Sequence, residues 1–104
     1  IEPRDCVLTI NGTHAAAKLY ARDLPLSDPK VSPLFGNWEG LPPMLMFVGG
    51  DDILVPDARA LKAKLPSIDY HEEAGMMHDW PIFFLRESRA AQAQMAEFIG
   101  RNSV

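Results

Sequence analysis

The sequence predicts an α/β fold in which two neighbouring parallel strands are flanked by helices. Residues 44–48 form a continuous apolar run of strand length, as expected for a strand that is buried on both faces of a parallel sheet. A helical pattern follows over residues 56–65, and a second strand-like stretch over residues 68–74. Strand, helix and strand within about 30 residues make a βαβ unit, whose connection places the two strands parallel to each other.

We expect one domain segment with three parts, of which residues 1–22 are the first, a leading helical segment. Thr13 can cap a short helix over residues 14–22, since a threonine hydroxyl accepts a hydrogen bond from the first turn of a helix. The apolar face of this helix would comprise Ala16, Leu19 and Tyr20.

The second part, residues 23–43, is expected to be an extended connection without regular structure. Proline fixes φ and removes a backbone donor, so a high density of prolines prevents both helices and strands. The breakers in this stretch are Pro25, Pro29, Pro33, Gly36, Gly40, Pro42 and Pro43.

The third part, residues 44–104, is the βαβ unit followed by a last helix. Pro56 suits the first turn of the intervening helix, which would reach about Leu65 and end before Pro66. The second strand, residues 68–74, is less apolar than the first, so we expect it closer to the sheet edge. The buried stripe of the intervening helix would comprise Ala58, Leu61 and Leu65.

The last helix is predicted over residues 87–99, with Gly100 as its stop, because glycine favours the conformation that ends a helix. Residues 81–85 are ambiguous between helix and loop. The inward face of the helix would comprise Ala91, Met95, Phe98 and Ile99.

Composition and charge exclude several classes of function. The 104 residues are 47% hydrophobic and 23% charged, as in a globular protein. The net charge of −4 and the absence of a basic run argue against nucleic-acid partners. No apolar run approaches the ~20 residues of a membrane span. The single Cys6 permits no internal disulfide and no cysteine zinc site, which favours a reducing, cytoplasmic location.

Two loops carry candidate catalytic groups. Residues 49–54 leave the carboxyl end of the first strand and contain Asp52, and residues 75–80 leave the second strand and contain His78. Open α/β sheets place ligands and catalytic groups at the carboxyl ends of their strands. Adjacent strands lie about 4.8 Å apart, so an acid at the end of one strand and a histidine at the end of the next can come into contact. A carboxylate that holds one imidazole nitrogen leaves the other nitrogen free to act as a base.

Other interpretations compete at each of these positions. Asp51 and Asp57 are alternatives to Asp52 as the acid, although aspartate beside glycine is often a turn former and Asp57 suits the first turn of its helix. A lone histidine is more often structural than catalytic. We expect His71 on the solvated side of its strand and His14 at a helix start. No metal-binding spacing such as HExxH occurs, so no metal is expected.

Four motifs in order resemble the C-terminal third of the hormone-sensitive-lipase-like esterases, the fold-3 carboxylesterases of the α/β-hydrolase fold. They lie at residues 28–36, 40–43, 49–54 and 75–78. The resemblance runs from about Asp23 to Ile99. Each motif is weakly specific alone, whereas four with sensible spacing are strong evidence.

The resemblance implies a carboxylic ester hydrolase, lipase-like in family, with a Ser-His-Asp triad and no cofactor. The family's acid motif matches Asp52-Ile53-Leu54, and its histidine loop matches residues 75–78 and so His78. The chain would supply the last two parallel strands of the α/β-hydrolase sheet and their helices. Its substrate would be a small-molecule ester of a short acyl chain. Pocket-lining roles are expected for Met76, Met77 and Trp80.

The nucleophile is missing from this pattern. None of the five serines lies in Gly-x-Ser-x-Gly, and no His-Gly-Gly oxyanion motif occurs. We therefore expect both upstream of Ile1, in an N-terminal part of the same domain, and we expect this chain alone to be inactive. Two alternatives are a non-catalytic relative that binds small molecules and a free-standing interaction domain. A homo-oligomer is compatible with each.

Overall fold

The computed structural model describes residues 4–103 and has the predicted fold class, two parallel strands with flanking helices. In this part of the chain the sheet contains β1 (Leu45–Gly49) and β2 (Asp69–Glu73), paired from Leu45 with Asp69 to Gly49 with Glu73. The helices are α1 (Ile10–Ala21), α2 (Val55–Lys64) and α3 (Arg86–Asn102), with short 3₁₀ turns η1 (Pro33–Phe35) and η2 (Trp80–Ile82).

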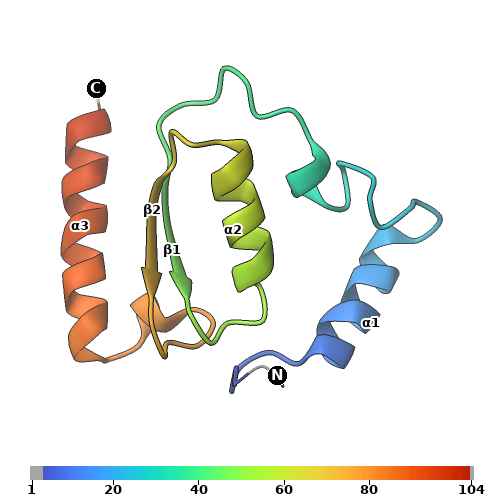
Figure 1. Ribbon diagram of the computed structural model, residues 1–104, viewed down its shortest axis with the longest axis horizontal. Helices are drawn as coiled ribbons and strands as arrows, with labels where there is room; N and C mark the ends of the chain where they lie inside the picture. The colour runs from blue at the N-terminus through green and yellow to red at the C-terminus, as the bar shows by residue number, and fades with distance from the viewer. Residues whose placement is uncertain (1–3, 104) are drawn as a thin grey trace.

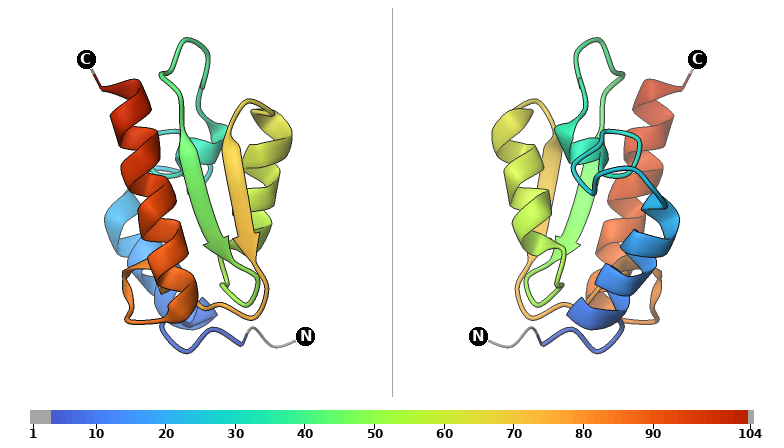
Figure 2. Two further views of the ribbon diagram at one scale, coloured as in Figure 1. Left: turned by 90° about the vertical axis from the view of Figure 1, so that its left-hand side faces the viewer. Right: turned by 90° about the vertical axis from the view of Figure 1, so that its right-hand side faces the viewer.

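The strands form the middle layer of the fold. Helix α2 connects β1 to β2 on one face, and α3 packs on the other face (Figure 1). Both side views in Figure 2 show the same sandwich of α3, sheet and α2. The segment before α1 passes beside the carboxyl ends of both strands (Figure 1). This arrangement confirms the predicted βαβ unit and leaves the strand ends at one edge of the molecule.

The core lies where β1, α2, η2 and α3 meet. The rings of Phe47 and Trp80 pack in a T-shaped arrangement with centroids 6.0 Å apart, and the Ser88 hydroxyl of α3 donates to the Trp80 carbonyl at 2.6 Å. The loop after β2 is thereby fixed to the start of α3. The buried apolar residues are Ala21, Val48, Leu61, Ile68, Trp80 and Ala91. No helix within residues 4–103 combines the length and apolarity needed to cross a bilayer.

The first helix differs from the prediction. It begins at Ile10 after Thr9, whose hydroxyl accepts from the Gly12 N–H at 3.2 Å, so Thr9 and not Thr13 is the cap. Thr13 lies inside the first turn, and its hydroxyl donates to the Thr9 carbonyl. The predicted apolar face is exposed within the described residues: Leu19 and Tyr20 are 81% and 73% exposed, and Ala21 is the buried residue of the helix.

Three further features differ from the prediction. The Pro-rich connection contains η1, because Pro33 occupies a first-turn position where the missing N–H costs nothing. Helix α3 continues through Gly100 to Asn102, whose side-chain amide donates to the Phe98 carbonyl at 2.9 Å and so satisfies a terminal acceptor. Ile99, predicted to face inward, is 62% exposed.

The remaining strand and helix bounds lie within one residue of those predicted. Strand β1 begins at Leu45 and includes Gly49, so the predicted Met44 lies just before it. Helix α2 begins at Val55 and ends at Lys64, before the proline that stops it. Residues 81–85, which the sequence pattern did not assign to helix or loop, begin inside η2.

Candidate active site

The loop after β1 holds Asp52 in a rigid turn. The Asp52 N–H donates to the Gly49 carbonyl at 3.1 Å, and Asp52 Oδ1 accepts from the Leu54 N–H at 2.7 Å. The Asp52 carbonyl then accepts from the Val55 N–H at 3.1 Å, where α2 begins. Asp52 is 6% exposed, so its carboxylate is buried with one oxygen still available to a partner.

The loops after β1 and β2 approach each other closely. The Gly50 N–H donates to the Glu73 carbonyl at 2.8 Å, and the Asp51 N–H donates to the Met76 carbonyl at 3.0 Å. A Cβ atom on Gly49 would lie 2.1 Å from the Met76 carbonyl oxygen, so only glycine allows the approach. Gly49, the last residue of β1, therefore has a steric role that its turn-forming character alone does not predict.

The loop after β2 turns sharply to present His78. Gly75 has φ 74° and Asp79 has φ 57°, so left-handed residues lie on both sides of the Met76–His78 stretch. Asp79 tolerates this conformation better than most non-glycine residues. The Trp80 N–H then donates to the Met77 carbonyl at 3.4 Å as η2 begins. These turns bring the His78 ring back over the loop of Asp52.

Asp52 and His78 are in contact as predicted. His78 Nδ1 lies 3.0 Å from Asp52 Oδ2, and the His78 side chain is 24% exposed. An ionised carboxylate can only accept, so the proton of this contact belongs on Nδ1, and Nε2 keeps its lone pair. His78 Nε2 lies 3.5 Å from Asp79 Oδ1, whose side chain is 58% exposed. The arrangement can hold an imidazole with a basic nitrogen directed away from the acid.

Within residues 4–103, none of the competing candidates pairs with His78, although Asp57 also lies in the wall of the cavity that Asp52 and His78 line. Asp57 is in the first turn of α2, and no hydrogen bond joins Asp51 or Asp57 to His78 within the described residues. His71 stacks on Phe47 with centroids 5.0 Å apart and pairs with Asp69 at 2.9 Å, so it is half-buried rather than solvated. His14 lies in α1 and is exposed.

A cavity of about 590 Å³ opens beside the pair. Asp52 and His78 form part of its wall, and Trp80 also lines it, although a role of Trp80 in substrate binding stays a prediction. The lining does not include Met76 or Met77, so their role in substrate binding stays a prediction. Most of the remaining wall comes from apolar side chains of β1, η1 and α2. This cavity could bind an apolar group next to the basic nitrogen.

Asp5 is a third acidic residue at the site, which the sequence interpretation missed. Its Oδ2 accepts from the Ile53 N–H at 3.2 Å, and its Oδ1 accepts from the Val7 and Leu8 N–H groups at 2.8 and 3.2 Å. Nothing in the local pattern connects it to a residue 48 positions later. The one available signal was an aspartate just before a helix start, which usually indicates a turn.

The carboxylates and the imidazole lie close enough to be considered as metal ligands. Asp5 and Asp52 each have one carboxylate oxygen, and His78 one ring nitrogen, in a group of three atoms that all lie within 4.8 Å of one another. Asp52 Oδ2 is already engaged by His78 Nδ1, however, and both oxygens of Asp5 accept backbone N–H groups. The donor atoms are therefore occupied by one another and by the backbone, which suits a hydrogen-bonded network better than a metal site.

Comparison with known proteins agrees with this geometry. Residues 2–82 match the family described as the alpha/beta hydrolase fold. An esterase of Acinetobacter venetianus is 34% identical to this chain; the match covers 93% of this chain and 34% of the esterase. An acetyl-hydrolase of Streptomyces hygroscopicus is also 34% identical, and that match covers 74% of this chain and 27% of the acetyl-hydrolase. The resemblance to α/β-hydrolase esterases is thereby confirmed.

Solved structures give the same result. A crystal structure of a Staphylococcus aureus protein assigned as an esterase superposes with a TM-score of 0.85 at 36% identity, covering 91% of this chain and 34% of that one. The chain spans about a third of the length of the relatives that it matches.

Proposed function

Starting from the fact that this chain belongs to the α/β-hydrolase fold family, we propose that it carries the acid and the base of a carboxylic ester hydrolase. Asp52 is the acid and His78 is the base of a Ser-His-Asp triad. The observation that carries this proposal is the 3.0 Å contact between His78 Nδ1 and Asp52 Oδ2 at the carboxyl ends of two adjacent parallel strands.

In this mechanism His78 Nε2 takes the proton of a serine hydroxyl as the serine attacks the ester carbonyl. The imidazolium then returns the proton to the leaving alcohol, and water repeats the sequence on the acyl-serine. Asp52 keeps the proton of the neutral ring on Nδ1 and stabilises the imidazolium when it forms. No cofactor takes part in the proposed reaction.

The nucleophile in this proposal comes from a different stretch of polypeptide. Within residues 4–103 no serine hydroxyl is hydrogen-bonded to His78. Ser88 is buried and donates to the Trp80 carbonyl, and Ser103 donates to the Ile99 carbonyl. The chain spans about a third of its relatives' length, which leaves room for a nucleophile and oxyanion donors outside it. We infer that residues 1–104 alone do not hydrolyse esters.

The proposed substrate is a small ester with a short acyl chain. Relatives described as an esterase and an acetyl-hydrolase support this class. The cavity beside His78 is lined mostly by apolar side chains and has about 590 Å³ of space, enough for a small apolar group.

Hydrolysis of an aryl acetate by the complete gene product tests the proposal. In His78→Ala, kcat/KM should fall by about 10⁴-fold or more, because the base is removed, while the melting temperature changes little. Asp52→Asn should also lose activity, since an amide can favour the wrong tautomer. His14→Ala is the matched control, because His14 is exposed in α1 and does not line the cavity.

Two outcomes would contradict the proposal. Wild-type activity in His78→Ala would exclude His78 as the base. A complete gene product that binds an aryl ester without hydrolysing it, and that has no serine in a nucleophile elbow, would identify a small-molecule binding protein of the same fold.

A further inference from the structure

We propose that Asp5 is a positioning residue, which joins the acid loop to the base loop and so sets the Asp52–His78 contact before any substrate binds. This inference rests on the proposed function for its catalytic consequence. Its structural part, the control of the His78 ring by Asp5, can be measured without catalysis.

The first half of the argument is local. Asp5 Oδ1 accepts from the N–H groups of Val7 and Leu8, which fixes a turn just before α1. Such a turn is common for aspartate and requires only one side-chain oxygen. This turn alone gives no reason for a carboxylate rather than an amide.

The second half crosses the molecule. Asp5 Oδ2 accepts from the N–H of Ile53, the residue directly after the proposed acid. A carboxylate oxygen of Asp5 also lies within 4.8 Å of an Asp52 oxygen and a His78 nitrogen. Asp5 therefore connects the segment before α1 with both loops at the strand ends, and the three segments are far apart in the sequence.

The charge state of Asp5 fits this role. Burial raises its pKa, but backbone N–H groups that face its carboxylate, chiefly those of Val7, Leu8 and Ile53, outweigh burial and lower the pKa below its ordinary value. Asp5 is therefore ionised at neutral pH, and a carboxylate can accept on both oxygens at once. These backbone donors stabilise a second negative charge next to Asp52, where two neighbouring carboxylates would otherwise repel each other.

Asparagine separates the two halves of this role. An asparagine at position 5 keeps one acceptor oxygen for the local turn, but its amide group is a donor and cannot accept from Ile53. Asp5→Asn should therefore keep the turn before α1 and lose the connection to the acid loop. Asp5→Ser is a second variant, because a hydroxyl supports the same kind of turn but is shorter and uncharged.

The experiment uses the complete gene product with ¹⁵N-labelled histidine, and His78→Gln assigns the His78 resonances. Wild type should show one His78 tautomer with a slowly exchanging proton on Nδ1. In Asp5→Asn and Asp5→Ser this proton should exchange rapidly and both tautomers should appear. We expect kcat to fall by up to about 10²-fold with KM unchanged, because a small misplacement of the base affects the chemical step and not binding.

Asp28→Asn is the matched control. Asp28 Oδ1 accepts from the Lys30 N–H at 2.9 Å and forms a similar turn in the Pro-rich connection. This variant should leave the tautomer and kcat unchanged. A single tautomer and wild-type kcat in both folded Asp5 variants would overturn the inference and leave Asp5 as a turn former.

The spectra and the kinetics separate the two proposals. Loss of the single tautomer in Asp5→Asn, in a protein without esterase activity, would support the positioning role and contradict the proposed function. An active enzyme whose His78 tautomer and kcat do not change in the Asp5 variants would support the proposed function and contradict the positioning role.

Discussion

At the scale of single residues, one glycine determines how closely the proposed acid and base loops approach. A Cβ atom on Gly49 would lie 2.1 Å from the Met76 carbonyl oxygen and 2.6 Å from its carbonyl carbon. Both are backbone atoms, so no side chain can rotate away. Because this approach carries the Asp51–Met76 hydrogen bond, it also holds the loop of Asp52 beside the loop of His78.

Gly49→Ala should therefore destabilise the protein by about 2 kcal/mol or more, because the two loops must separate to admit one methyl group. Urea denaturation of variant and wild type measures the difference. Gly100→Ala is a control of opposite sign, since it lies inside α3 with nothing within 4 Å of its Cβ position. Alanine at position 100 should raise the free energy of unfolding by about 0.5–1 kcal/mol. Equal stability of Gly49→Ala and wild type would contradict the steric argument.

A cluster on the outer face of α2 and β2 controls part of the pH dependence of stability. Arg59 donates to Glu72 Oε2 at 3.0 Å, and the Tyr70 hydroxyl donates to the same oxygen at 2.7 Å. The hydrogen bond from Arg59, followed by that from Tyr70, lowers the pKa of Glu72 to about 2. Burial, then the bond to Glu72, raises the pKa of Tyr70 to about 12.

These shifts give stability a defined sign at each end of the pH range. The folded-state pKa of Glu72 is below its ordinary 4.5, so its contribution is complete above 4.5 and is lost as the pH falls toward 2. The pKa of Tyr70 is raised from 10, so its contribution is lost as the pH rises from 10 toward 12. Glu72→Gln should remove the acid-side contribution, about 1 kcal/mol at most for a solvated pair. Unfolding free energies of Glu72→Gln and wild type, measured from pH 2 to 7, test this. An equal loss of stability in both proteins as the pH falls would contradict it.

At the scale of elements, the sequence predicted what depends on local pattern. The apolar run at 44–48 and the proline-bounded helix after it predicted β1, α2 and β2 within one residue at each end, because an apolar run and the prolines beside a helix are visible in short windows. The strand ends predicted where a candidate acid and histidine would lie, and the family resemblance selected Asp52 and His78. What failed depends on side-chain contacts, local or distant, that the residue pattern does not show.

Two elements show the physical reason. The face of α1 with Leu19 and Tyr20 looks apolar in the sequence, but nothing within residues 4–103 covers it. Helix α3 continues past Gly100 because the Asn102 and Ser103 side chains donate to carbonyls of its last turn. Asp5 is the third case, since its partner Ile53 lies 48 residues away.

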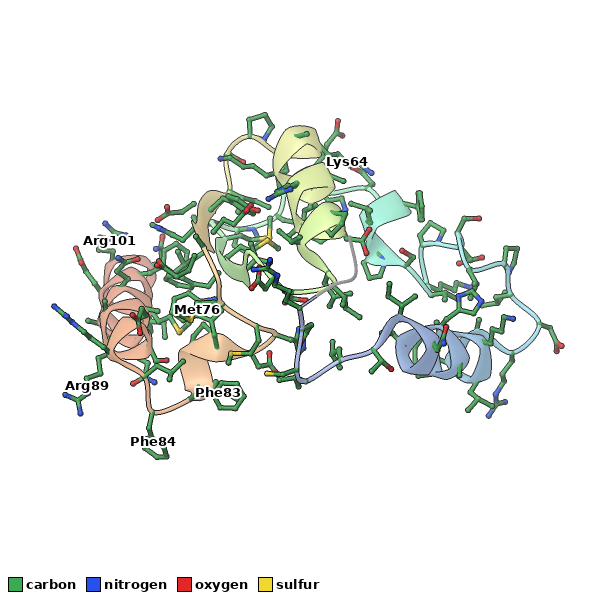
Figure 3. All side chains as sticks on the ribbon, turned by 60° about the horizontal axis from the view of Figure 1, so that its bottom comes forward. Lys64, Met76, Phe83, Phe84, Arg89 and Arg101 are labelled. Carbon is green, nitrogen blue, oxygen red and sulfur yellow. The ribbon has the colours of Figure 1, made fainter. Side chains whose placement is uncertain are left out.

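The Lys64 side chain connects α2 to η1 through hydrogen bonds. Lys64 Nζ donates to the Leu34 carbonyl at 2.9 Å and to the Gly36 carbonyl at 2.7 Å, and Figure 3 shows Lys64 at the end of α2 beside this turn. Pro33 and Leu34 of η1 line the cavity next to His78, so Lys64 also fixes part of the proposed pocket wall.

Lys64→Met should release η1 while leaving the fold intact, because methionine keeps most of the apolar stem but cannot donate. Amide exchange at Phe35 and Gly36 should accelerate, and global stability should change by about 1 kcal/mol or less. Lys18→Met on α1 is the control. Unchanged exchange at Gly36 would show that η1 is held by packing alone.

At the scale of the whole molecule, residues 4–103 form an open structure. The radius of gyration is 15.1 Å, whereas a compact domain of this length has about 13 Å. Helix α1 lies apart from the sheet, beyond α2 (Figure 1). Large apolar side chains are exposed, among them Leu19, Phe35, Ile82, Phe84 and Ile99. The two-stranded sheet has free edges, and an apolar cavity runs along β1.

An exposed strand edge next to apolar surface favours pairing with another chain. We therefore predict that residues 1–104, expressed alone, associate through the β1 side of the sheet. Light scattering coupled to size exclusion should give a mass above the 11.6 kDa of one chain. Met46→Lys should shift the distribution toward the monomer, because Met46 lines the cavity along β1 and a charge there opposes apolar contact.

Phe84 provides the competing explanation and its control. Its side chain is fully exposed between η2 and α3 and projects away from the body of the molecule (Figure 3). If association instead uses this surface, Phe84→Lys and not Met46→Lys will produce the monomer. A cooperative melt together with a monomeric mass for the unmodified chain would contradict both, because it would show that this two-stranded sheet is stable with its edge and cavity exposed to water. The mass distribution therefore decides whether the apolar surface along β1 is an interface or a tolerated solvent-facing groove.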